Sequence, residues 1–138
     1  NHGFKAVQIS SSAWTAEALK HTMPASVFSR STESHNQDKV SMGTIAARDC
    51  LRVLALTEQV AAAHVLATVQ AARLRLRDAP GTQLSPALRA FIDDVGRQSP
   101  LVVEDRPLEA ELRALTARLA ACEPIGEASG GIRRGEAA

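Results

Sequence analysis

Aromatic side chains are scarce in this sequence. Its 138 residues include three Phe, one Trp and no Tyr, although 45% of the residues are apolar. Sandwiches and barrels draw on aromatic and β-branched strands, whereas small aliphatic side chains suit helices that approach one another closely. We therefore expect an all-α fold, in which a segment of a long-helix bundle is followed by short C-terminal helices.

An excess of one charge is also lacking. The chain has 16 basic and 15 acidic residues, which are interspersed and leave a net charge of +1. The nearest thing to a basic cluster is Arg73, Arg75 and Arg77, which lie where a helical pattern ends and where cations complement the helix dipole. No aromatic side chains alternate with them to stack on bases. Nucleic acid is therefore not an expected partner.

Cysteine is limited to Cys50 and Cys122, both in helical and apolar surroundings. This placement predicts two buried thiols in a reducing compartment rather than a disulfide framework. The four histidines show no zinc-type spacing with each other or with the cysteines, so no metal is expected.

Long apolar runs are also missing. The longest uncharged stretch in a helical pattern, residues 59–72, is short for a membrane span and contains four polar side chains: Gln59, His64, Thr68 and Gln70. No stretch has the pattern of a signal peptide. We expect a soluble, cytoplasmic protein with no membrane partner.

Helical periodicity divides the chain into four segments. Apolar residues recur at helical spacing from residue 4 to about 22, and a long pattern covers about 41–78. Residues 79–82 break it, and two peripheral helices follow at about 85–96 and 107–122, the first capped by Ser85 and closed by Gly96. Residues 1–123 are expected to form part of one helical domain, and residues 124–138 a flexible tail.

The long helix presents a burial problem. After Glu58 it is apolar nearly all round, and a helix without a polar face must be buried on every side. A chain of 138 residues cannot easily surround it. The missing cover is expected to come from another chain or from more of this polypeptide.

The segment 24–40 between the first two helices has the opposite character. Its residues 29–38 contain no apolar side chain. A dense polar loop held between rigid helices is a common way to build an active site. Either Asp38 or Ser41 is expected to cap the helix that follows.

This loop and the start of the next helix read Ser34-His35-Asn36-Gln37-Asp38-Lys39-Val40-Ser41-Met42-Gly43, which resembles a signature of the aromatic amino acid ammonia-lyases and aminomutases. The preceding Pro24-Ala25-Ser26-Val27 and the long Ala- and Leu-rich helix fit the same family. The resemblance covers roughly residues 1–123 and is strongest to the bacterial tyrosine-specific branch.

The resemblance implies a C-terminal segment of a lyase that eliminates ammonia from an aromatic amino acid, giving p-coumarate from L-tyrosine. It also implies a homotetramer of long helices whose sites are completed by several subunits. Its cofactor would be an electrophilic methylidene-imidazolone, formed from an Ala-Ser-Gly that we expect upstream of this chain. Ala128-Ser129-Gly130 spells that triad, but we interpret it as a coincidence because a Gly-rich tail cannot impose the strain of cyclisation.

The resemblance implies roles for four loop residues. Asn36 and Gln37 match positions beside the electrophile, where side-chain amides can hydrogen-bond its carbonyl and the substrate. The histidine-specific branch has a glutamate where Gln37 stands, so Gln37 favours an uncharged aryl substrate. Glu33 matches an acidic position near the substrate amine, with a surface glutamate or a partner for Arg30 as the alternative. His35 is a candidate for substrate contact or for support of its neighbours.

Other interpretations stay open at this point. The chain has no tyrosine to act as the family's proton-abstracting base, so we expect it to be inactive without the rest of the lyase polypeptide. Phenylalanine as the substrate, or an aminomutase, fits the same loop. A non-catalytic helical assembly module would explain the long helix but would not need so polar a loop.

Overall fold

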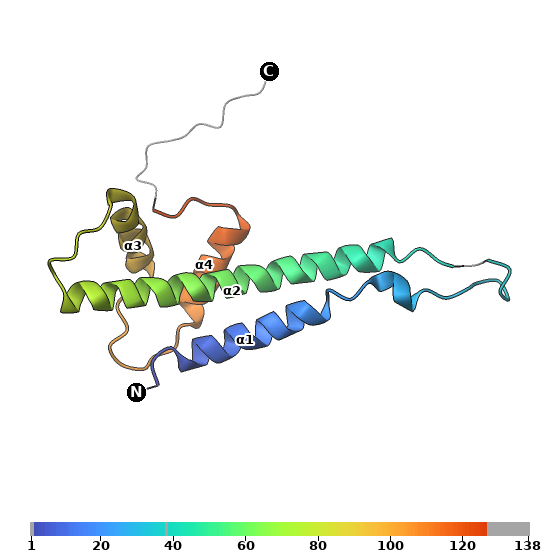
Figure 1. Cartoon of the computed structure of the whole chain (residues 1–138), viewed down its shortest axis with the longest axis horizontal. Helices are drawn as coiled ribbons and strands as arrows, with labels where there is room; N and C mark the ends of the chain where they lie inside the picture. The colour runs from blue at the N-terminus through green and yellow to red at the C-terminus, as the bar shows by residue number, and fades with distance from the viewer. Residues whose placement is uncertain (1, 38, 127–138) are drawn as a thin grey trace, which may run out of the picture. The chain divides into compact units, whose positions relative to one another are not determined.

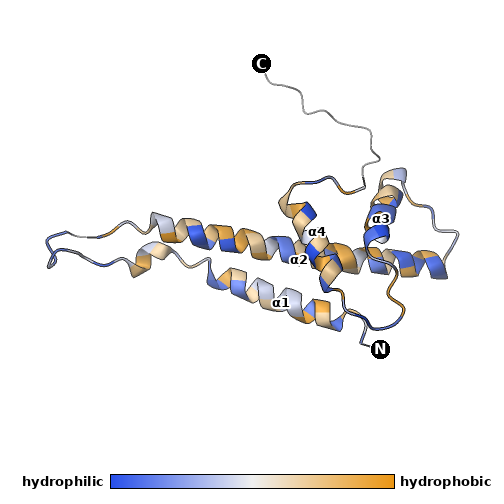
Figure 2. Cartoon of the chain, turned by 180° about the vertical axis from the view of Figure 1, so that it is seen from behind, coloured by the Kyte–Doolittle hydropathy of each residue, from blue (hydrophilic) through white to orange (hydrophobic). Residues whose placement is uncertain are grey.

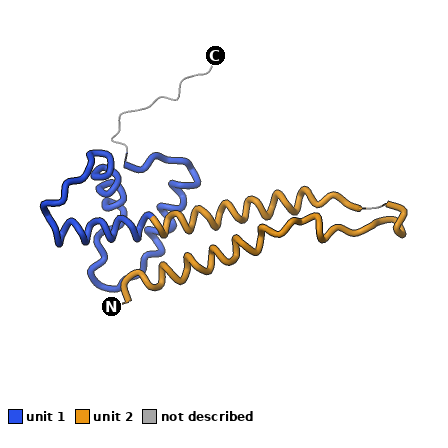
Figure 3. The backbone as a smooth tube through the Cα atoms, viewed as in Figure 1, with its two compact units in different colours: residues 1, 65–138 blue, residues 2–64 orange. Residues whose placement is uncertain are grey.

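The computed structural model describes residues 2–37 and 39–126, which form two compact units divided within the long helix (Figure 3). One unit comprises residues 2–64 and the other begins at Val65. The described residues contain four α-helices and one short 3-10 helix, with no strand (Figure 1). The expected all-α fold is confirmed.

In the first unit, α1 (Lys5–Lys20) lies antiparallel to the first part of α2 (Gly43–Asp78). Glu17 accepts a hydrogen bond from Arg52 Nε at 2.7 Å, and His21 Nδ1 lies 3.1 Å from Asp49 Oδ1. These two pairs fix the register of the two helices at the end that leads into the polar loop.

The face of α1 that turns toward α2 follows the apolar spacing of its sequence. Val7 is buried, and Phe4, Trp14 and Ala18 are partly buried, at intervals of three, seven and four residues. Leu56 on α2, which belongs to the same unit, is completely buried. The helical period expected over residues 4–22 is therefore present.

The start of α2 lies slightly later than its sequence pattern suggested. The helix begins at Gly43, whose N–H donates to Ser41 Oγ at 3.4 Å, while the Ala46 N–H bonds to the Met42 carbonyl. Ser41 thus takes up one of the backbone donors that every helix leaves free in its first turn. Asp38, the other expected cap, lies outside the described residues.

In the second unit, the end of α2 packs with α3 (Pro86–Gln98) and α4 (Glu109–Ala120). Its core is aliphatic and consists of buried side chains from all three helices: Leu66, Val69, Ile92, Val95 and Leu115. Gln70 holds the connection between α3 and α4, donating to the Val102 carbonyl at 2.7 Å and accepting from the Val102 N–H at 3.1 Å.

Ser85 caps α3 as expected, accepting from the Leu88 N–H at 3.3 Å, but the predicted end of this helix was wrong. Gly96 does not close α3, which continues to Gln98. The last turn of α3 packs against the Arg73 guanidinium, which itself donates to the Ser99 carbonyl. A Cβ at Gly96 would lie 3.5 Å from that guanidinium, an ordinary contact distance, so the helix passes through Gly96 without requiring a glycine there.

The two cysteines also differ from expectation. Both are free and exposed rather than buried. Cys50 lies on α2 among residues that are exposed in this chain, and Cys122 follows α4 with a left-handed φ of 53°. Helical periodicity placed these residues in helices but did not determine which side they face.

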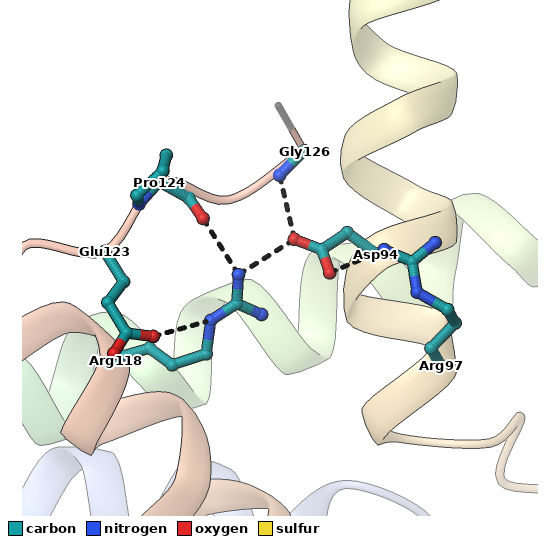
Figure 4. A network of polar contacts seen from close by, with 6 residues as sticks. All are labelled: Asp94, Arg97, Arg118, Glu123, Pro124 and Gly126. Atoms are coloured by element: carbon teal, nitrogen blue, oxygen red, sulfur yellow. Dashed lines mark hydrogen bonds and ion pairs between the residues drawn. The ribbon is translucent and has the colours of Figure 1, made fainter. Parts of the chain in front are cut away.

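A polar network ties α4 and the segment after it to α3 (Figure 4). Asp94 Oδ2 accepts from Arg118 and from the Gly126 N–H, both at 2.9 Å, and Arg118 also donates to the Pro124 carbonyl. The segment expected to be tail from residue 124 is therefore held as far as Gly126. The rest of that expected tail, with Ala128-Ser129-Gly130, lies outside the described residues.

This network predicts a pH-dependent stability. The hydrogen bond from Arg118, followed by that from the Gly126 N–H, holds the pKa of the Asp94 carboxyl below its ordinary value. A depressed folded-state pKa stabilises the protein above the unfolded pKa, and this stabilisation is lost as pH falls through the folded pKa. We expect the melting temperature of Asp94→Asn to fall less than that of the wild type between about pH 5 and about pH 3.

The exposed neighbour Asp93 offers a matched control. We expect Asp93→Asn to keep the wild-type pH dependence, and Asp94→Asn to lose about 1–3 kcal/mol of stability near neutral pH. Thermal melts of the three proteins across the pH series measure both effects. Equal pH slopes for all three would contradict the assignment.

The surface of α2 leaves much apolar area uncovered. Ile45, Leu51 and Leu54 are exposed, and Figure 2 shows apolar and polar stretches along this helix. In the described part of the chain, α2 alone is long and apolar enough to cross a membrane, by length and composition only. Its apolar stretch is 22% buried within the chain, and the core helices of soluble proteins can have the same length and composition.

Candidate active-site loop

The polar loop begins with a short 3-10 helix that follows the end of α1. This helix, Ala25–Phe28, starts after Pro24, whose fixed φ suits the entry to a turn. Ala25 is buried, whereas Val27 and Phe28 are exposed. The chain then extends away from the two helices that anchor it (Figure 1).

Residues 29–37 and 39–40 form an irregular hairpin. Thr32 and Gln37 exchange both backbone hydrogen bonds, at 3.2 and 3.3 Å, and form an antiparallel bridge. Nearer the helices, the Val40 N–H donates to the Arg30 carbonyl and Ser29 Oγ donates to the Val40 carbonyl at 2.6 Å. The loop is therefore closed by hydrogen bonds at two places, although the sequence shows no strand pattern that would predict them.

The turn at its tip has an unusual backbone. Glu33, Ser34 and His35 all adopt left-handed conformations, with φ values of 49°, 55° and 69°. The Asn36 N–H closes the turn on the Glu33 carbonyl at 2.9 Å. Left-handed conformations are disfavoured for residues with a Cβ, and runs of them concentrate at functional sites. The tip thus combines local strain with the four residues selected from the sequence.

Two of these four side chains are supported from within the loop. His35 Nδ1 lies 2.5 Å from Ser31 Oγ, and Gln37 Oε1 accepts from Thr32 Oγ1 at 3.3 Å. Both candidates remain exposed. The side chains of His35 and Gln37 are thus each held by a hydrogen bond with a nearby hydroxyl group.

The other two candidates, Glu33 and Asn36, are exposed, and neither side chain has a hydrogen-bond or ion-pair partner among residues 2–37 and 39–126. The alternative that Glu33 pairs with Arg30 is not what the structure contains. Arg30 donates instead to the carbonyls of Phe28 and Ser29. A carboxylate and an amide therefore remain available for a ligand.

Ser31 and Thr32 were not selected as functional residues from the sequence. A signal for Ser31 existed, since it precedes His35 by four residues, but that spacing is meaningful in a helix and not in a loop. The contact from Thr32 to Gln37 depends on the hairpin register. Nothing in the sequence fixes that register in advance.

The turn gathers groups of several hydrogen-bonding kinds. Amide donors and acceptors, a carboxylate and an imidazole lie on one short turn and are exposed, so they are accessible to a small polar ligand. Within the described residues no group of His, Cys, Asp and Glu is placed to hold a metal ion.

Known proteins with a similar sequence and structure identify the class to which this all-α chain belongs. A solved structure of tyrosine aminomutase from Streptomyces globisporus matches with a TM-score of 0.72 and 35% identity, covering 88% of this chain and 22% of that one. The family model described as aromatic amino acid lyase matches residues 1–97. The chain belongs to the aromatic amino acid lyase family.

Curated relatives add detail. Tyrosine ammonia-lyase from Cereibacter sphaeroides is 38% identical over 128 residues, covering 91% of this chain and 24% of the relative. Tyrosine ammonia-lyase from Cupriavidus metallidurans is 37% identical over 117 residues, covering 85% and 21%. Histidine ammonia-lyases and a tyrosine 2,3-aminomutase are also among the relatives. The chain spans less than a quarter of the length of these curated relatives.

Proposed function

We propose that this chain is the C-terminal segment of an aromatic amino acid ammonia-lyase, a carbon–nitrogen lyase that eliminates ammonia from L-tyrosine to give p-coumarate. The observation that carries the proposal is the similarity to tyrosine ammonia-lyases over most of this chain. The segment supplies one face of the active site and part of the helical scaffold.

Gln37 supports an uncharged aryl substrate. A neutral amide next to the ligand offers directed hydrogen bonds without the cost of a desolvated charge beside an aryl ring. A carboxylate at this position would instead suit a cationic imidazole. Glu33, exposed one turn away, would accept a proton from the substrate amine or orient the departing ammonia.

The methylidene-imidazolone would come from the part of the polypeptide upstream of this chain. When present, it supplies an electrophile for the substrate amine. The residues here fit it, because the Asn36 amide has no partner within the described residues and can donate to a carbonyl oxygen. Asn36 and Gln37 would hold it and the substrate, while His35, set by Ser31, would contact the substrate or support its neighbours.

The uncovered apolar side chains of α2 support an assembly with the rest of the lyase and with further copies of it. Ile45, Leu51 and Leu54 are exposed in this chain, and burying such residues against other helices is favourable. A homotetramer, with no nucleic acid and no membrane as partner, is part of the proposal. Free thiols at Cys50 and Cys122 suit a cytoplasmic location.

The test uses the full-length protein, supplied separately with L-tyrosine, L-phenylalanine and L-histidine while product absorbance is followed. We expect aryl-acrylate from tyrosine at the highest kcat/KM and no turnover by the 138-residue chain alone. A full-length protein that released urocanate from histidine and left tyrosine unchanged would overturn the substrate assignment.

A tyrosine aminomutase is a second candidate, favoured by the match to that enzyme in both sequence and structure. Such an enzyme would return ammonia to the aryl-acrylate and release a β-amino acid. Chromatography of the tyrosine reaction separates the two outcomes. Accumulation of β-tyrosine would show that the protein is an aminomutase rather than an ammonia-lyase.

Gln37→Glu in the full-length protein is expected to lower kcat/KM for tyrosine by roughly 10- to 100-fold, because a carboxylate would be desolvated beside an uncharged ring. Gln83→Glu makes the same change at an exposed position between α2 and α3 and is expected to keep wild-type kinetics. Equal tyrosine kinetics for both variants would show that Gln37 does not face the substrate.

A further inference from the structure

The hairpin contains a pair of hydroxyls whose role the proposed reaction does not yet explain. Ser31 and Thr32 are adjacent, both are partly buried, and each contacts the side chain of one candidate site residue. Because successive residues of an extended segment point to opposite sides, the two hydroxyls serve different neighbours. The contact of Thr32 is the more informative, since it involves an amide with two distinct ends.

An amide presents an acceptor oxygen at one end and two N–H donors at the other. Thr32 Oγ1 donates to Gln37 Oε1 at 3.3 Å, so the hydroxyl engages one lone pair of the oxygen and turns the acceptor end toward residue 32. The paired backbone hydrogen bonds between the same two residues keep both side chains on neighbouring strands of the hairpin. Gln37 is exposed and its Nε2 has no partner among residues 2–37 and 39–126, so its N–H donors are open to a ligand.

We propose that Thr32 is a positioning residue that fixes the amide of Gln37 as a hydrogen-bond donor, so that the group recognised by Gln37 must be an acceptor. This inference rests on the proposed lyase function and deepens it. The chemical class it selects is a hydrogen-bond acceptor beside the aryl group, and not a donor such as the phenolic hydrogen of tyrosine. Without a hydrogen-bond donor at residue 32, the side-chain amide of Gln37 could rotate by about 180° and exchange the positions of its oxygen and nitrogen.

The same geometry explains why residue 37 can divide substrate classes. A glutamate there would still accept from the Thr32 hydroxyl through one oxygen and would present the other outward as an acceptor. Exchanging Gln for Glu would therefore reverse the hydrogen-bonding polarity of the exposed end, from donor to acceptor. With either residue, the Thr32 hydroxyl would engage one oxygen of the side chain at position 37.

The test in the full-length protein compares Thr32→Val, which keeps the shape and removes the hydroxyl, with Thr32→Ser, which keeps the hydroxyl. We expect Thr32→Val to lower kcat/KM for tyrosine about five- to tenfold, the value of one neutral hydrogen bond, and Thr32→Ser to restore most of it. In a Gln37→Ala background, Thr32→Val should have no further effect, because the amide it positions is gone. The same loss in both backgrounds would overturn the inference.

An activity-independent measurement separates this inference from the proposed function. In the ¹⁵N-labelled 138-residue chain, the side-chain amide signals of Gln37, assigned by their loss in Gln37→Glu, should shift in Thr32→Val and not in Thr32→Ser. The signals of the exposed Gln83 serve as the internal control and should not move. Unshifted Gln37 signals in Thr32→Val would overturn the positioning role. A full-length protein inactive on aromatic amino acids would overturn the function while the amide signals still decide the role of Thr32.

Discussion

Asn36→Ala in the full-length protein is expected to lower kcat for tyrosine by about 100- to 1000-fold, the loss typical of one preorganised donor in a water-excluded site. The reason lies in the loop. Asn36 is the first residue after the left-handed run, its backbone N–H closes the turn, and its side-chain amide has no partner within the described residues. Removing the side chain leaves the turn in place and removes the donor aimed at the ligand.

Initial-rate assays at saturating tyrosine measure this kcat, and a far-ultraviolet circular dichroism spectrum checks that the helical fold is kept. Lys39→Ala, in the same exposed loop but with no assigned role, is the control and should retain wild-type kcat. If Asn36→Ala kept more than half of the wild-type kcat, Asn36 would not contact the reacting groups. A raised KM with an unchanged kcat would show that the Asn36 amide binds the substrate but adds nothing specific to the transition state.

Leu56→Ala is expected to destabilise the protein by about 2–5 kcal/mol, because a fully buried leucine leaves a cavity that its neighbours fill only in part. Leu56 has no exposed surface, whereas Leu51, five residues earlier on α2, is 67% exposed. In the isolated chain, Leu51→Ala should therefore cost less than about 1 kcal/mol. Denaturant unfolding curves give both values.

The informative comparison repeats both variants in the full-length protein. If other helices cover α2 there, the cost of Leu51→Ala should rise toward that of Leu56→Ala, while Leu56→Ala stays costly in both forms. A Leu51→Ala variant as harmless in the full-length protein as in the isolated chain would show that no helix covers this face. That result would remove the physical argument for a shared helical core.

The helices were predictable from the sequence because their signals are local. Apolar spacing placed α1, Ser85 marked the start of α3, and Ala79 to Thr82 separated it from α2. The errors concern features that depend on packing between segments. Gly96 was expected to end α3, but the helix continues to Gln98, and its last turn packs against Arg73 of α2, a contact that local sequence signals do not show.

For the candidate site, the sequence and its family resemblance identified which residues to examine but not their arrangement. The left-handed run at Glu33, Ser34 and His35 has no glycine to announce it. The bridge between Thr32 and Gln37 depends on a pairing between two polar segments, which hydrophobic alternation cannot reveal. The supporting hydroxyls therefore became visible only with the structure.

The internal closure of the hairpin makes it a transferable part. Among the described residues of 29–40, the hydrogen bonds run to the same segment or to Ser26 and Phe28 just before it. A segment that holds its own shape can be exchanged between related proteins without repacking the helices that carry it. Substrate preference in such a scaffold can then be altered by replacing about a dozen consecutive codons, while the codons of the helices stay unchanged.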